Sequence, residues 1–234
     1  QVTISGYASV IGVNNDLEAS VLSTTTSVDE AICLSGEPMV SGDLYTCGEQ
    51  TCVSMTGSPT VAGSTDPAEI AEHVHNDVEA PDFPALDTSA LEPLAVNVVD
   101  SSTKIESGAV LNNIRIKAGT NPTFNNDMTI NGIVYIEAPN KVTFNGGLTL
   151  NGLVVTEDSG QPLSDCQIKF AGHVTANGVE ALPDTEAFAA VKQQTGTFCL
   201  APGFDVTFTG TFDTVNGNIA ADKLTFSGEA AGTI

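Results

Sequence analysis

One phrase of twelve residues recurs along this chain and limits what it can fold into. It reads FNGGLTLNGLVV at residues 144–155 and FNNDMTINGIVY at residues 124–135. Its template is an apolar residue, Gly two residues later, a second apolar residue at the sixth step and Gly at the eighth. Complete or partial copies begin at Ile4, Leu34, Met55, Phe124, Phe144, Phe170, Phe208 and Phe226. Such self-similarity indicates a repeat architecture, in which each copy stacks on the next.

The spacing between copies matches one rung of a β-helix. It is 18 to 21 residues at three places: Leu34 to Met55, Phe124 to Phe144, and Phe208 to Phe226. Apolar and polar residues alternate within each copy, as they do in strands. Stacked rungs lie about 4.8 Å apart and bury each other's apolar rows. We therefore predict an all-β fold, a parallel β-helix with three-strand rungs of about 18–20 residues.

The first residue of each later copy should point into the interior. We expect an internal stack of Phe124, Phe144, Phe170, Phe208 and Phe226. Asn-Gly pairs recur at one phase of the repeat, where a corner needs a residue that tolerates positive φ: Asn131-Gly132, Asn151-Gly152, Asn177-Gly178 and Asn216-Gly217. Because Asn-Gly is also a hairpin signal, an antiparallel meander is the competing fold.

Two stretches interrupt the repeat, residues 64–100 and 179–200. We predict both to be helical insertions into a single solenoid domain that spans residues 1–234, because insertions can leave a corner without disturbing the stacked rows. A helix near 67–78 would begin with the cap Asp66-Pro67 and carry one apolar stripe: Ile70, Val74 and Val78. A second helix near 185–194 would follow the cap Asp184 and turn two residues inward: Phe188 and Val191.

The charge balance excludes several partners. The chain has 29 acidic and 7 basic residues, a formal charge of −22. Nucleic-acid backbones and anionic membranes are bound through Lys and Arg, so we expect neither as a partner. No apolar run approaches the ~18 residues of a membrane span, and we expect no membrane insertion by this fragment. The chain opens at Gln1 already in an alternating pattern, which we interpret as a processed product whose export or anchor segment has been removed.

The five cysteines fit disulfides better than a zinc site. Four residues separate Cys47 from Cys52, wider than the C-x2-C pairs of zinc knuckles. An exported protein can hold disulfides, and we expect the bridges Cys47–Cys52 and Cys166–Cys199, with Cys33 unpaired. Spacing does not fix the connectivity, and five buried thiols are the alternative.

Residues for catalysis are scarce. β-Helix enzymes that cleave polysaccharides need clustered carboxylates beside basic residues or catalytic acids. The single arginine, Arg115, alternates with Ile114 and Ile116 beside Lys117, which indicates the exposed face of a strand. The chain has no Trp and three Tyr, so it offers few platforms for stacking sugars. We predict that it is not an enzyme, and a polysaccharide-degrading enzyme is the less favoured alternative.

Two metal sites are conceivable. In EHVHND, His73 and His75 would face different directions on a helix, but on a strand they would share a face and could share zinc or copper. The helix signals favour the first arrangement. The loop sequences NNDMT and EDSGQPLSD gather oxygen ligands without matching an EF-hand. Calcium is therefore the one cofactor we consider, with the ligands Asp127, Glu157, Asp158 and Asp165.

Threonines form two further rows. Thr precedes the first Phe of a copy at 123, 143, 207 and 225, and precedes the sixth step at 129, 149 and 175. Alternation turns these side chains outward, as in ice-binding solenoids, so an ice- or polysaccharide-binding solenoid is the second functional hypothesis. Threonine also favours strands for its own sake, and Lys169 interrupts the first row.

Three stretches carry a family resemblance: PDFPALDTSALEPLA, IRIKAGTNPTFNNDMTINGIVYIEAPNKVTFNGGLTLNGLVV and FCLAPGFDVTFTGTFDTVNGNIAADKLTFSGEAAGTI. Over residues 81–234 the chain resembles bacterial exported β-helix proteins related to the solenoid domains of PilX-type pilus-assembly proteins. The resemblance implies an extracellular, surface- or pilus-associated structural role with other surface or pilus subunits as partners, and it supplies no catalytic residues. Unpaired strands at the ends of a stack also predict association of the chain with itself, end to end, into a filament.

Overall fold

The computed structural model describes residues 1–234 except 13, 26–29, 49–52, 81–87, 159, 194–196, 216–217 and 234. Strands dominate, and the chain divides into two compact units: unit 1, Gln1–Pro84 with Lys223–Ile234, and unit 2, Ala85–Asp222. The ladders between the described strands are parallel. The antiparallel meander is therefore wrong, and the expectation of a parallel all-β fold is confirmed.

Unit 2 is built from strands of up to twelve residues with short 3-10 turns between them. Its strands are β10 (Asn97–Val99), β11 (Ala109–Ile116), β12 (Thr123–Phe124), β13 (Met128–Ile136), β14 (Asn140–Phe144), β15 (Leu148–Thr156), β16 (Cys166–Phe170), β17 (Val174–Ala176), β18 (Thr197–Phe208), β19 (Phe212–Val215) and the first part of β20 (Asn218–Phe226). Its 3-10 helices are η2 (Thr88–Leu94), η3 (Leu163–Asp165), η4 (Val179–Ala181), η5 (Glu186–Phe188) and η6 (Val191–Gln193).

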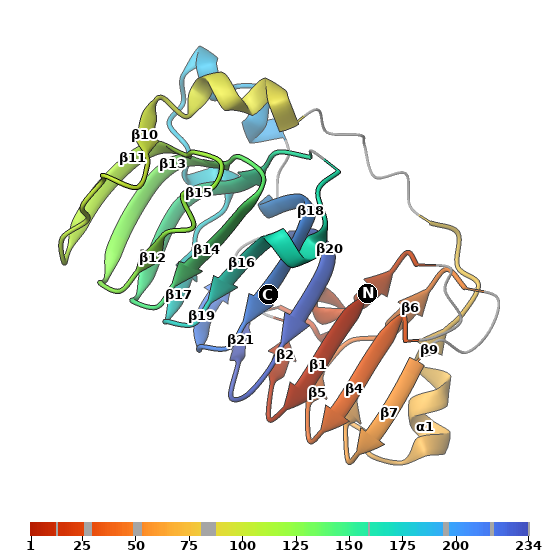
Figure 1. The fold of residues 1–234 in the computed structure, drawn as a ribbon. Coiled ribbons are helices and arrows are strands. Elements are labelled where there is room, and N and C mark those ends of the chain that lie inside the picture. The colour runs from red at the N-terminus through yellow and green to blue at the C-terminus, as the bar shows by residue number, and fades with distance from the viewer. Residues whose placement is uncertain are drawn as a thin grey trace. The chain divides into compact units, whose positions relative to one another are not determined.

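These strands pair in three parallel ladders (Figure 1). The first joins β12, β14, β16 and the end of β18. The second joins β11, β13, β15, β17 and β19. The third joins β10 to the later parts of β11, β13 and β15 and to the start of β18. Between β13 and β15 the register is unbroken from Met128 with Leu148 to Ile136 with Thr156. Each residue of β13 therefore pairs with the residue at the same position in the next copy of the repeated phrase.

Phenylalanine rings form a column inside unit 2. They occupy matching register positions, and successive centroids lie 5.0, 5.3 and 4.8 Å apart along Phe124, Phe144, Phe170 and Phe208. All four are buried, and burial of one such side chain stabilises a fold by about 1.5–3 kcal/mol. Phe226, the fifth residue of the predicted stack, is buried in unit 1 opposite Ile4.

A second apolar layer covers one flank of unit 2. Buried side chains of β13 and β15 pack there against residues of the 3-10 segments, in a cluster that includes Ile133, Tyr135, Leu153, Val155, Leu182, Phe188 and Val191. The inward positions of Phe188 and Val191 are therefore confirmed. The predicted helix near 185–194 is wrong, because η5 and η6 are separate 3-10 turns. A spacing of three residues places both side chains on one face of such turns.

Unit 1 has the same plan with shorter strands. Its elements are β1 (Val2–Gly6), β2 (Ser9–Ile11), η1 (Asp16–Ala19), β3 (Val21–Ser23), β4 (Ile32–Gly36), β5 (Met39–Val40), β6 (Leu44–Thr46), β7 (Val53–Gly57), β8 (Thr60–Val61), α1 (Pro67–Glu72), β9 (Val74–His75), the end of β20 and β21 (Ala231–Thr233). Its three ladders are β20–β1–β4–β7, β21–β2–β5–β8 and β3–β6–β9.

Helix α1 is shorter than the predicted helix near 67–78. It begins as expected, because Asp66 Oδ1 accepts a hydrogen bond from the Ala68 N–H at 2.8 Å and Pro67 takes the first turn. It ends at Glu72, and the next residues form β9, which pairs with β6. Val74 is β-branched and fits a strand better than a helix, and the Leu44 N–H of β6 donates to the His73 carbonyl at 2.9 Å.

In the Asn-Gly pairs, the glycine allows close approach of two backbones and the asparagine forms side-chain hydrogen bonds. At Gly152 a Cβ atom would lie 2.0 Å from the carbonyl oxygen of Gly132, so no side chain fits between these two strands. Three of the asparagines that precede these glycines, together with Asn112, form a ladder of Nδ2–H to Oδ1 bonds, 3.1, 2.8 and 2.7 Å long, along Asn112, Asn131, Asn151 and Asn177. The pair Asn216-Gly217 lies outside the described residues.

Candidate functional site

The four predicted calcium ligands do not come together. Three of them contact separate segments: Asp127 Oδ1 with the Gly147 N–H at 2.7 Å, Glu157 Oε2 with the Ala138 N–H at 2.9 Å, and Asp165 Oδ1 with Lys141 Nζ at 3.5 Å. Asp158 is exposed. In the parts of the chain that the structure describes, no group of three or more His, Cys, Asp or Glu side chains is arranged to hold a metal ion. The first three carboxylates instead tie neighbouring segments together.

The buried cysteines Cys166 and Cys199 are free thiols. Cys166 lies opposite Asn140 in the first ladder of unit 2 and Cys199 opposite Val154 in the third, so the predicted bridge between them is not formed. Burial raises the pKa of Cys199 to about 12, which keeps this thiol protonated and unreactive. Cys33 and Cys47 are also free, and Cys52, the expected partner of Cys47, lies outside the described residues.

Unit 1 contains a cluster of polar side chains around Asp43, which we call the histidine clasp. His73 Nδ1 contacts Asp43 Oδ1 and His75 Nε2 contacts Asp43 Oδ2, both at 2.8 Å. The Tyr45 hydroxyl donates to Asp43 Oδ2 at 3.3 Å, and its ring stacks on His75 with centroids 4.7 Å apart. Partial burial raises the pKa of Asp43, but the hydrogen bonds from His75 and His73 outweigh this effect and lower the pKa below its ordinary value.

The clasp exists because the helix ends early. His75 lies on strand β9 and His73 lies just before it, so both side chains reach the same carboxylate. The expectation that the pair faces different directions on a helix is therefore wrong. Each imidazole approaches a different oxygen of Asp43, an arrangement that ties β9 to the residue before β6. A charged acceptor between two donors makes such bonds stronger than neutral ones.

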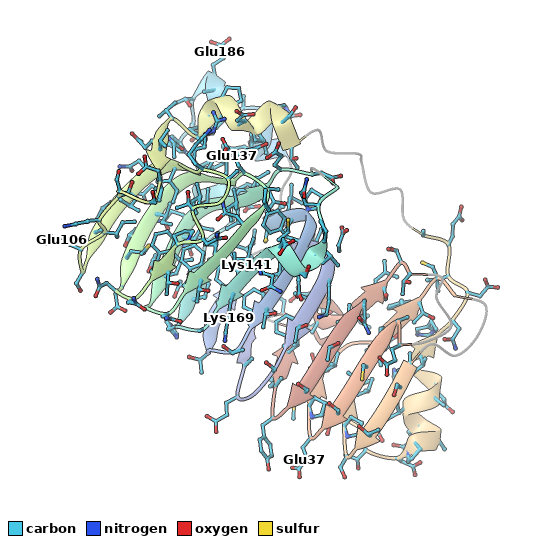
Figure 2. The ribbon with its side chains drawn as sticks, viewed as in Figure 1. Glu37, Glu106, Glu137, Lys141, Lys169 and Glu186 are labelled. Atoms are coloured by element: carbon cyan, nitrogen blue, oxygen red, sulfur yellow. The ribbon has the colours of Figure 1, made fainter. Side chains whose placement is uncertain are left out.

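Unit 2 contains a buried carboxylate that the sequence analysis missed. Glu137, labelled in Figure 2, directly follows β13. It is 8% exposed. Its Oε1 accepts from Arg115 Nε and Lys117 Nζ, both at 2.6 Å, and its Oε2 accepts from the Ala118 N–H at 3.0 Å. Burial raises the pKa of Glu137, but the bonds from Lys117, Ala118 and Arg115 lower it below the ordinary value. We call this set the Glu137 network.

Arg115 is more enclosed than expected. Its side chain is 28% exposed and also pairs with Glu92 of η2, so the exposed strand face predicted for it is wrong. Glu137 lies 20 residues after Lys117 and 22 after Arg115. That separation is close to the repeat length, and it is the signal in the sequence that would have found the network.

The outward threonines of unit 2 form one continuous row. Thr129, Thr149 and Thr175 lie opposite one another on β13, β15 and β17, and each is half-buried. We call them the outer threonine row, and neighbouring strands in it are about 4.8 Å apart. The other predicted row is interrupted, because Lys169 stands between Thr143 and Thr207.

In the described residues, no helix is long and apolar enough to span a membrane. No family model matches the chain, and neither the curated proteins nor the solved structures contain a match. The likeness to the solenoid domains of PilX-type pilus-assembly proteins therefore stays a prediction, carried by the three sequence stretches quoted for it.

Proposed function

We propose that the ladders of each unit are the turns of a parallel β-helix, and that the protein is a non-catalytic structural and interaction module of the cell surface. The observation that carries this proposal is the repeated register. Side chains of one kind occupy one position on successive strands, with Phe inside and Asn and Thr outside. Strands stacked in this way make each unit stiff, which suits a scaffold or spacer.

The charged side chains support a structural role. In the histidine clasp and the Glu137 network, each carboxylate joins two strands or their flanking residues and is already satisfied by two or more donors. A catalytic acid or base needs instead a free position from which it reaches a substrate. These groups therefore contribute to stability rather than to chemistry.

The proposed partners are other surface or pilus subunits, or a second copy of the chain. Strand β7 pairs with β4 and, within the described residues, with no further strand. Such an edge offers backbone donors and acceptors to another strand, and a head-to-tail contact would extend into a filament. The charge of −22 opposes contact between copies, so a filament would need a cation such as calcium or a basic partner.

The test uses the organism that makes the protein. Antibody against the purified chain should label intact cells, and cross-linking on those cells should join the chain to a surface or pilus subunit or to itself. Labelling that appears only after permeabilisation would contradict the surface location. Release of reducing or unsaturated sugar from polysaccharides by the purified chain would contradict the non-catalytic role and favour the enzyme.

A second candidate function is binding of ice or of a polysaccharide surface. The outer threonine row favours it, because hydroxyl groups spaced by the strands present a regular array to a lattice. Thermal hysteresis that disappears in Thr149→Lys but persists in Thr143→Lys, which lies outside this row, would support ice binding. Normal freezing in the presence of the native chain would exclude it.

A further inference from the structure

Unit 2 has a cavity of about 290 Å³ at the end of its phenylalanine column. It lies between β12 and the segment that joins β10 to β11. Polar residues line it on both sides: Asp100, Ser101 and Thr103 in the joining segment, and Thr120, Thr123 and Asn125 around β12. Its size is just below the range of about 300–1,000 Å³ found for small-molecule sites.

The floor of the cavity is the last ring of the column. Phe124 stacks on Phe144 and also lines the cavity. The carbonyl groups of Pro122 and Phe124 accept bonds from β14 or the residues that follow it. Because alternate residues of a strand address opposite neighbours, the N–H and C=O of Thr123 point away from β14, to the side where no described strand pairs with β12.

The wall opposite is held in place by its own hydrogen bonds. Asp100 Oδ1 accepts from the Ser102 N–H at 2.9 Å, from the Ser102 hydroxyl at 2.6 Å and from the Thr103 hydroxyl at 3.2 Å. These bonds, led by those from Ser102, lower the pKa of Asp100, so the carboxylate stays ionised. Asn126 Nδ2 donates to the Ile105 carbonyl at 3.4 Å and links the two sides.

The chemistry of this lining selects a neutral ligand rich in hydroxyl groups. None of the side chains that line the cavity is Lys, Arg or His, and one carboxylate is present, so an anion is disfavoured. Hydroxyl, amide and carboxylate groups can exchange hydrogen bonds with several sugar hydroxyls. Pro122 lines the cavity, is half-buried, and offers a small apolar surface to the C–H face of a sugar.

We propose that this cavity binds one ring of a neutral saccharide, with its hydroxyls on Asp100, Thr123 and Asn125 and its apolar face against Pro122. The site is separate from the outer threonine row. It does not depend on the surface role proposed above, and a failure of one leaves the other standing.

Saturation-transfer NMR on the whole chain tests the proposal. The probes are the methyl glycosides of glucose, galactose, mannose and N-acetylglucosamine, with galacturonic acid as the anionic control. We expect transfer from the protein to at least one neutral glycoside and none to galacturonic acid. Thr123→Val should weaken that binding about fivefold through one lost hydrogen bond. The matched control is Thr143→Val, because Thr143 lies opposite Thr123 on the next strand and outside the cavity.

Asp100→Asn provides a second variant if Thr123→Val perturbs the fold. It keeps the shape of the side chain, and we expect it to weaken the neutral glycoside and to reduce the rejection of galacturonic acid. Absence of transfer to all four neutral glycosides at millimolar concentration overturns the proposal. So does an equal loss of binding in Thr143→Val. A response of the cavity amides to calcium alone, or to an extended peptide but not to sugars, also overturns it.

Discussion

The two units share a plan of three parallel ladders but differ in the side chains that hold it. At the first position of the phrase, unit 1 aligns the aliphatic series Ile4, Leu34 and Met55, whereas unit 2 aligns phenylalanines. Residues 1–84 contain no Lys or Arg, and in unit 1 the strands β6 and β9 are tied through histidines. Unit 2 ties its strands through Arg115 and Lys117. The same backbone arrangement therefore tolerates two kinds of core and two kinds of polar contact between strands.

This difference shows which features the architecture requires. The glycines at these positions are needed in both units, since Cβ atoms at Gly57 and Gly152 would lie 2.3 and 2.0 Å from carbonyl oxygens of the paired strands. The residue type that fills each interior row differs between the units, and so do the side chains that pair with the carboxylates. Unit 1 carries its carboxylates almost without fixed positive charge, so its stability should depend more on pH and on salt.

The largest expected effect is in the core. Phe144→Ala should lower the free energy of unfolding of unit 2 by about 3–5 kcal/mol, and Leu34→Ala should lower that of unit 1 by about 2–5 kcal/mol. Both side chains are buried between two register partners. Urea denaturation monitored by NMR signals from each unit gives the two values. Thr143→Ala, on the outward side next to Phe144, should cost less than about 0.5 kcal/mol. A loss below about 1 kcal/mol for Phe144→Ala would contradict the column.

Glu137→Gln should come next, at about 1–3 kcal/mol, because it removes the charge that accepts from Arg115 and Lys117. The pKa of Glu137 is lowered in the folded state. Its stabilisation is therefore present above the unfolded-state pKa and is lost as the pH falls through the folded-state pKa. Native chain and variant should differ at pH 7 and converge in strong acid. Lys141→Gln, which breaks an exposed pair, is the control and should have almost no effect. A constant difference at all pH values would show that charge is not the cause.

Asp43→Asn should cost about 1 kcal/mol in unit 1. The carboxylate is 15% exposed and holds both histidines, but their rings are more accessible to water, which screens the pairs. The lowered pKa of Asp43 gives the same sign as for Glu137, with stability lost toward acid. Hydrogen exchange at the β6 and β9 amides should increase in the variant while the amides of β13 and β15 stay unchanged. Equal changes in both units would argue against a local tie.

The smallest expected effect is that of salt on stability, which should rise in unit 1 and fall in unit 2. Raising NaCl from 20 to 500 mM screens the repulsion among carboxylates of unit 1 and should slow its amide exchange, by a few tenths of a kcal/mol. The same salt weakens the Lys and Arg pairs of unit 2. Calcium at matched ionic strength tests the acidic loops, since specific binding would raise the melting temperature more than magnesium or sodium does. If all three cations shift the melting temperature equally, the effect is electrostatic screening and not specific binding of calcium.

The phenylalanine column could be predicted because one residue type recurs at one spacing and strand alternation turns it inward. The end of α1 could not, because the residues after Glu72 favour a helix by local pattern and a strand by pairing with β6. The Glu137 network was missed for a different reason. Glu137 lies outside the repeated phrase, and only comparison across one repeat length relates it to Arg115.

The cysteines illustrate a limit of spacing. Cys166 and Cys199 look like a pair along the sequence, but the register assigns them to different ladders. The histidine pair shows the opposite case, in which two residues judged to diverge converge on Asp43. Both outcomes depend on which strand each residue belongs to and on what that strand pairs with. The pairing partners lie more than twenty residues away in the sequence.

The asparagine ladder bears on how a repeat protein of this kind could lengthen by gene duplication. In every bond from Asn112 to Asn177 the later residue donates and the earlier one accepts. A duplicated segment that begins and ends at equivalent asparagines would therefore find a donor waiting on one side and an acceptor on the other. Gene duplication could add one strand, about 4.8 Å, to the ladder without requiring a new kind of contact. A duplicated segment that did not begin and end at equivalent asparagines would leave one side-chain amide without its partner. The ladder therefore favours duplications of whole repeats.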